Sequence, residues 1–201
     1  MRPITVRLLV SVFFLSGVSA LIYQVAWQRL LFGAFGVDVE SVTIIISTFM
    51  LGLGCGALAG GKLADRFPGH LILMFALSEF GIGLFGLVSP ALILWIGDLF
   101  VQSSLALVAT VNFALILVPT VLMGSTLPML VAHAFKGSHN VGVSIGTLYF
   151  YNTLGAAFGA FLSSAVLFSY IGLNQAIYAA ACGNFIVAAT AINLARREAI
   201  V

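Results

Sequence analysis

A glycine-rich apolar run at residues 49–61 most constrains what this chain can fold into. Within the run, Gly52, Gly56 and Gly60 recur every four residues, so in a helix they lie on one face. In lipid, small residues at this spacing let a second helix approach closely. A cluster of charged residues follows the run directly. The pattern therefore predicts a membrane-spanning helix that ends at this cluster and packs tightly through its glycines.

Composition points to the same class. The chain has 201 residues, of which 62% are hydrophobic and only 7% charged, whereas a soluble domain has about 25% charged residues. We therefore expect residues 1–201 to form a single transmembrane domain whose main surroundings are the lipid bilayer. The net charge of +2 is small and the basic residues are scattered, so we expect no nucleic-acid partner. Cys55 and Cys182 lie in apolar runs without metal-ligand spacing, and no metal or cofactor is expected.

Six stretches are long and apolar enough to span a bilayer, which requires about 20 residues each. They are residues 8–28, 42–61, 71–96, 105–134, 142–168 and 174–195. Residues 18–20 resemble a signal-peptidase site, but the apolar run continues past them, so we expect an uncleaved first helix. Pro119 and Pro128 interrupt the fourth stretch. Because proline removes a helix hydrogen bond, we expect a kink or a locally unwound segment there.

The charges between the stretches predict the orientation. Basic residues precede the first stretch and follow the second, fourth and sixth, whereas the other links are acidic or neutral. Because cytoplasmic loops of membrane proteins carry an excess of Lys and Arg, we expect both termini to be cytoplasmic.

A weak internal repeat relates the first three stretches to the last three. The second stretch carries its three glycines, and the fifth carries Gly155 and Gly159. The third carries Glu79 and the sixth carries Asn184. Since an odd number of spans inverts the second unit relative to the first, we predict two inverted three-helix units. This is the plan of half a major facilitator transporter.

Residues 61–70 (GKLADRFPGH) resemble the loop between the second and third helices of the major facilitator superfamily, with Gly61, Asp65 and Arg66 at motif positions. The match departs at Pro68 and His70.

A broader resemblance covers most of the chain. Residues 21–31, 117–128 and 146–156 are similar to the membrane region of bacterial spermidine synthase-like proteins, which fuse a facilitator-like bundle to an aminopropyltransferase domain. The resemblance implies a bacterial cytoplasmic membrane and a polyamine-like ligand. The family usually has an acidic residue where Gln24 stands, which weakens a proton-relay role at that position. No glycine-rich nucleotide loop and no acidic catalytic pair is present, so we expect no synthase activity.

Glu79 is the carboxylate that lies well inside an apolar stretch. A charge at membrane depth costs several kcal/mol and often marks a substrate or proton path. The alternative is that Glu79 lies near the cytoplasmic interface and fixes its helix through hydrogen bonds. Neutral amides lie within four other stretches: Gln24, Asn112, Asn152 and Asn184. Interhelical hydrogen bonding is their ordinary role, but a cluster of them would suit a small polar or cationic ligand.

Aromatic residues near the expected span ends are Tyr23, Trp27, Tyr149 and Tyr151. Aromatics there usually anchor a helix at the membrane interface, and a cation-binding cage is the alternative. No motif for nucleophilic catalysis is present, so we assign no catalytic residue.

Three functions fit these features. The leading one is transport, or binding for transport, of a small cationic or polar metabolite. Facilitators bind substrate between two six-helix halves, so a lone half would need a partner, most simply a second copy that contacts the glycine faces of the second and fifth helices. The competing function is a non-transporting accessory subunit of a larger membrane complex. A membrane anchor for a separately encoded synthase is a third possibility.

The charge pattern makes a topological prediction. In a background that lacks Cys55 and Cys182, single cysteines near Lys62 and Lys136 should react with a membrane-impermeant thiol reagent only from the cytoplasmic side. Cysteines near Glu40 and Asp98 should react only from outside. Labelling of the Lys136 and Asp98 regions from the same side would exclude the six-span arrangement.

Overall fold

The structure, a computed structural model, describes residues 3–35, 39–100, 105–135 and 141–199. All regular elements in these ranges are helical. Six are long: α1 (Pro3–Phe35), α2 (Val39–Arg66), α3 (Leu71–Phe100), α4 (Leu105–Phe135), α5 (Val141–Leu162) and α7 (Leu173–Ala199). Between α5 and α7 the chain forms a π-helix, η1 (Ser163–Leu167), and a single turn, α6 (Phe168–Tyr170).

The six long helices confirm the six predicted spans. Each is long and apolar enough to cross a membrane, and together they define a multi-pass, all-α membrane protein. The fifth predicted span, 142–168, covers α5 and η1 and ends at the first residue of α6. Gly172, with φ of +83°, makes the turn into α7. This left-handed conformation is one that glycine adopts without steric cost.

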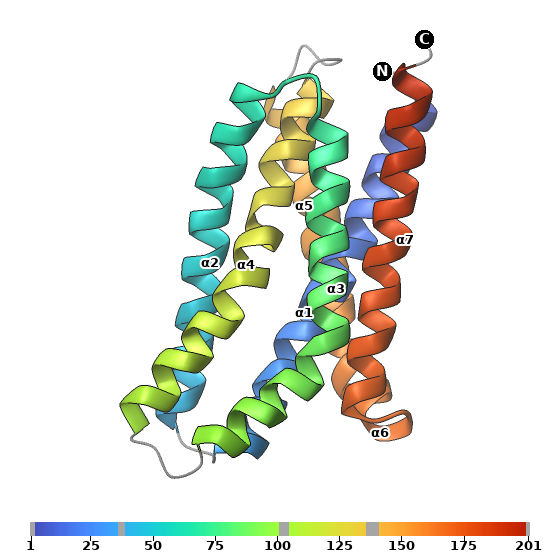
Figure 1. Ribbon diagram of the computed structural model, residues 1–201. Helices are drawn as coiled ribbons and strands as arrows, with labels where there is room; N and C mark the ends of the chain where they lie inside the picture. The colour runs from blue at the N-terminus through green and yellow to red at the C-terminus, as the bar shows by residue number, and fades with distance from the viewer. Residues whose placement is uncertain (1–2, 36–38, 101–104, 136–140, 200–201) are drawn as a thin grey trace.

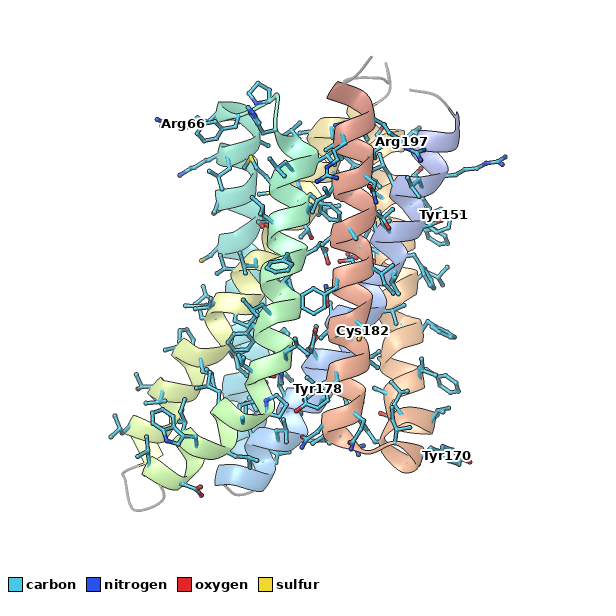
Figure 2. All side chains as sticks on the ribbon, turned by 45° about the vertical axis from the view of Figure 1, so that its right-hand side comes forward. Arg66, Tyr151, Tyr170, Tyr178, Cys182 and Arg197 are labelled. Atoms are coloured by element: carbon cyan, nitrogen blue, oxygen red, sulfur yellow. The ribbon has the colours of Figure 1, made fainter. Side chains whose placement is uncertain are left out.

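The helices run side by side as a bundle, and α1 begins at the end of the bundle where α7 ends (Figure 1). The most extensive contacts are those of α2 with α4, α1 with α5, and α3 with α7, followed by those of α1 with α7 and α3 with α4. Arg66 and Arg197 lie at this same end, whereas Tyr170 lies at the other (Figure 2). We call it the basic end, because Lys62, Arg66, Arg196 and Arg197 all lie in the final turns of α2 and α7.

The glycines of α2 face α4. Gly52, Gly56 and Gly60 are buried, and a methyl group added to Gly56 would collide with the carbonyl oxygen of Val121 and with the Cα of Gly124. The two backbones are therefore in direct contact. Close approach of this kind requires residues without side chains.

The glycines of α5 face α1 in the same way. A methyl group on Gly155 would collide with the carbonyl oxygen of Phe14, and one on Gly159 with that of Val18. The glycine faces of α2 and α5 are thus occupied within the chain. Our expectation that they contact a second copy is wrong for these glycines, because no space remains beside them.

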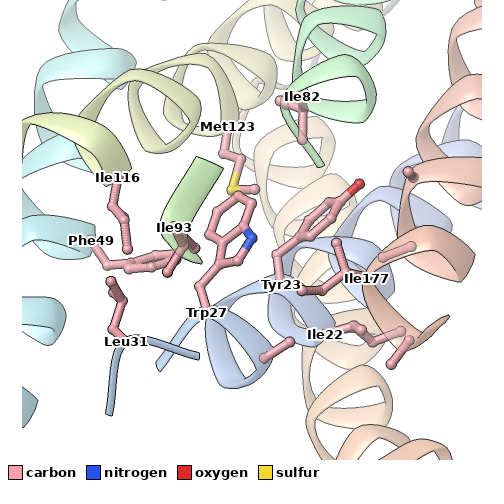
Figure 3. Close-up of a cluster of buried hydrophobic side chains, with 14 of the residues drawn as sticks. Ile22, Tyr23, Trp27, Leu31, Phe49, Ile82, Ile93, Ile116, Met123 and Ile177 are labelled. Carbon is pink, nitrogen blue, oxygen red and sulfur yellow. The ribbon is translucent and has the colours of Figure 1, made fainter. Parts of the chain in front are cut away.

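A buried aromatic cluster lies around α1 (Figure 3). The rings of Tyr23 and Trp27 stack with centroids 4.8 Å apart, and Trp27 Nε1 donates a hydrogen bond of 2.8 Å to Ser89 Oγ. Both side chains are fully buried, so their predicted role as interface anchors is wrong. The reason is that α1 packs against α3, α5 and α7. Tyr149 and Tyr151 are exposed, as interface anchors would be.

The prolines of α4 do not interrupt it. Pro119 and Pro128 both lie inside the continuous helix, so of the two outcomes that we expected, a kink or a locally unwound segment, the unwound segment is absent from α4. Hydroxyl groups beside them donate to backbone carbonyl oxygens: Thr120 to Ile116 at 2.9 Å and Thr126 to Met123 at 2.7 Å. The carbonyl groups that lose their helical donor are those of Leu115 and Gly124, four residues before each proline, so these hydroxyl bonds do not replace the lost ones. Figure 1 shows that α3, which contains Pro90, changes direction in its second half.

The glycine contacts can be tested with a matched pair on one helix. Gly56→Leu should lower the free energy of unfolding by about 1–3 kcal/mol, because the new side chain forces α2 and α4 apart. Gly54 has no atom within 4 Å of an added methyl group, so Gly54→Leu should change stability little. Thermal unfolding in mild detergent measures both. Equal stability of the two variants would show that the α2–α4 contact is not close.

Candidate functional site

A buried carboxyl group joins three helices. Glu79 of α3 is fully buried. Its Oε1 accepts a hydrogen bond of 2.6 Å from Ser16 Oγ of α1, and its Oε2 accepts one of 2.6 Å from Asn184 Nδ2 of α7. Both donors are neutral side chains. Hydrogen bonding of both oxygens makes burial of the group tolerable, since an unpartnered buried carboxylate would cost far more.

A hydroxyl contact extends this polar region toward α4. Ser78 Oγ of α3 lies 3.3 Å from Ser125 Oγ of α4, and Ser125 Oγ also donates to the Leu122 carbonyl oxygen at 2.7 Å. Polar side chains therefore connect α1, α3, α4 and α7 at the interior of the bundle.

A cavity of about 110 Å³ lies beside Glu79. All six long helices contribute to its wall. Its polar lining consists of Ser16, Gln24, Thr126, Asn152 and Asn184. Its apolar lining includes Leu21, Phe49, Leu53, Ile82 and Met123.

Glu79 does not itself line the cavity, but Ser16 and Asn184 do. These two side chains separate the carboxyl group from the cavity. Because Nδ2 of Asn184 donates to Glu79, the acceptor Oδ1 is left over. This atom is buried and has no hydrogen-bond partner in the described part of the chain. The carboxyl group thus fixes the amide, and its acceptor oxygen stays buried without a partner.

The lining defines which ligands fit. Its polar groups are amides and hydroxyls, and no Lys or Arg among the described residues lines it. With a carboxyl group directly behind Ser16 and Asn184, the site suits a neutral polar or cationic ligand that donates hydrogen bonds. The volume equals that of a few water molecules at about 30 Å³ each. Sites for small organic molecules are usually about 300–1,000 Å³, so this cavity would form only part of such a site.

The structure brings together most of the polar residues that the sequence analysis selected. Gln24, Asn152 and Asn184 line one cavity, and Glu79 lies behind it. Asn112 belongs to α4, but its side chain lies outside the described residues.

The loop motif lies elsewhere. Asp65 and Arg66 are exposed in the last turn of α2, at the basic end, and Gly61 is half-buried one turn before them. None of the three lines the cavity.

Sequence reasoning missed Ser16 and Thr126. For Ser16 a signal was present, because Ser16, Ala20 and Gln24 recur every four residues and therefore share one face of α1. All three line the cavity.

In comparisons with known proteins, no family model, curated protein or solved structure matches this chain at a significant level. The geometry of the site must therefore carry the functional interpretation.

The hydrogen bonds of Glu79 predict a contrast between two substitutions. Glu79→Leu leaves the Ser16 hydroxyl and the Asn184 amide without their acceptor, and should lower the free energy of unfolding by about 1–3 kcal/mol. Glu79→Gln should be nearly silent, because its carbonyl oxygen accepts from Ser16 while its amide donates to a rotated Asn184. Thermal unfolding in detergent compares them. An equal loss of stability in both variants would contradict the conclusion that Gln can replace the hydrogen bonds of Glu79 with Ser16 and Asn184.

Proposed function

We propose that this protein binds a small cationic or polar metabolite in the central cavity and transports it across the membrane as an oligomer. The observation that carries the proposal is the cavity itself. Side chains from all six long helices converge on it, its polar lining is made of amides and hydroxyls, and a buried carboxyl group lies directly behind that lining. A polyamine-like ligand is suggested by the family resemblance alone.

The helix pairs support a half-facilitator architecture of two inverted three-helix units. If α1, α2 and α3 correspond to α4, α5 and α7, then the α2–α4 pair corresponds to the α5–α1 pair, and the α1–α7 pair to the α4–α3 pair. The α3–α7 pair is unchanged, because the correspondence exchanges α3 and α7. In both glycine-mediated pairs, the second helix of one unit contacts the first helix of the other.

The charges support the orientation that the sequence suggested. Lys62, Arg66, Arg196 and Arg197 lie at the basic end, whereas Asp98 lies near the end of α3 at the opposite side of the bundle. By the positive-inside rule the basic end is cytoplasmic. Both termini would then be cytoplasmic, in a bacterial inner membrane if the resemblance holds.

The exposed helices support an oligomer. Of the six spans, α5 and α2 are the least buried. Large apolar side chains of α5, such as Phe150, Phe158 and Phe161, are exposed. A second copy that covers these helices would bury these side chains. The same exposed faces favour the second candidate function, an accessory subunit covered by other proteins of a membrane complex.

Transport can be measured with reconstituted vesicles and a radiolabelled diamine such as putrescine. Glu79→Gln keeps the shape of the side chain but removes the negative charge behind the lining, and should reduce flux about tenfold, which corresponds to about 1.4 kcal/mol of lost attraction for a cation. Asn152→Leu should reduce flux as well, by filling the polar cavity. Thr153, the next residue, is exposed, so Thr153→Leu is the matched control and should retain wild-type flux.

The same preparation separates transport from the accessory role. Absence of any protein-dependent flux of diamines or small cations, together with stoichiometric co-purification of other membrane subunits, would decide for the accessory subunit. Wild-type flux in Glu79→Gln would assign the carboxyl group a structural role only.

A further inference from the structure

A second cavity lies at the basic end, separate from the central one. Its volume is about 680 Å³, which is within the range of sites for small organic molecules. It is formed where α3 begins and where α4 and α7 end. It shares no lining residue with the central cavity.

Three basic side chains from three different segments line this second cavity. His70 precedes α3, His133 lies in the last turn of α4, and Arg196 lies in the last turn of α7. A neutral imidazole has one N–H donor and a protonated imidazole has two. The guanidinium group of Arg196 offers a planar set of donors that matches the oxygens of a phosphate. No carboxylate among the described residues lines the cavity.

The start of α3 contributes backbone N–H donors, whereas the ends of α4 and α7 place the negative ends of their helix dipoles in the same region. The backbone nitrogen of Met74 donates to the His70 carbonyl oxygen at 2.9 Å, so the helical bonding begins there. The N–H groups of the preceding turn have no partner within the helix, and the helix dipole is positive at this end. The lining residues Leu71, Ile72 and Leu73 belong to this turn.

We propose that this cavity binds a phosphate group, carried by the headgroup of an anionic phospholipid or by a soluble phosphate. The cavity lies at the ends of the spanning helices, which is the depth of the lipid headgroups. Its apolar lining, including Leu73 and Ile192, continues from the basic groups along the helices, and Leu73 is exposed on the outer surface. Basic pockets between transmembrane helices are sites for anionic lipid headgroups.

The test is thermal unfolding of the purified protein in an uncharged detergent. Phosphatidylglycerol is added in one series and phosphatidylcholine in another, at equal mole fractions. A third series compares sodium phosphate with sodium chloride at equal ionic strength. We expect the wild-type unfolding midpoint to rise with phosphatidylglycerol but not with phosphatidylcholine.

Two arginine variants form a matched pair. Arg196→Gln should require about tenfold more phosphatidylglycerol for half of the shift, because a charge-assisted hydrogen bond is lost. Arg197, the next residue, does not line the cavity, so Arg197→Gln should respond like the wild type. His70 is exposed, and His70→Ala provides a second variant that decides the question if Arg196→Gln does not fold.

The outcomes distinguish the sources of the phosphate. A shift with phosphatidylglycerol that depends on Arg196 or His70 assigns the cavity to a lipid headgroup. A shift with sodium phosphate that depends on the same residues assigns it to a soluble phosphate. The proposal would be overturned if neither shift occurs. It would also be overturned if Arg196→Gln, Arg197→Gln and His70→Ala all show the same shift as the wild type.

Discussion

Direct backbone contact at small residues is the constraint on which this bundle depends. Between helices in lipid the hydrophobic effect provides no net attraction, so van der Waals packing has to hold them together. Gly56 allows α2 to touch α4, and Gly155 allows α5 to touch α1. These two contacts position the walls of the central cavity, because α2 supplies Phe49 and Leu53, and α5 supplies Asn152. A bundle held apart by one methyl group at either contact would lose the convergence of its polar side chains.

The sequence predicted the class and the six spans because length and hydropathy determine them almost directly. It also predicted that the α2 glycines would permit close packing. It did not show which helix would fill that space, since a four-residue spacing identifies a face but not its neighbour. For the same reason, the sequence did not show that Gln24 and Asn152 would line one cavity. Their meeting depends on how α1 pairs with α5, and no local pattern encodes that pairing.

The interface role of Tyr23 and Trp27 failed, and so did the unwound segment in α4. Tyr23 and Trp27 were placed by their position along the first span, but burial depends on how many helices surround a segment, and α1 is enclosed by several. For α4, the unwound segment was predicted from the helix hydrogen bonds that Pro119 and Pro128 remove. The helix nevertheless continues through both prolines. For Tyr23 and Trp27 the tertiary surroundings outweighed a sound local rule.

The hydrogen bonds of Glu79 have a mechanical consequence. A carboxyl group that receives donors from Ser16 and Asn184 fixes the axial positions of α1, α3 and α7 relative to one another. If any of these helices slid past the others by one turn, about 5.4 Å, both donors and the carboxyl group could not remain paired. These two hydrogen bonds therefore couple the axial positions of the three helices. The α2–α4 contact is made largely of backbone and small residues, so any shear within this bundle would be concentrated at that contact.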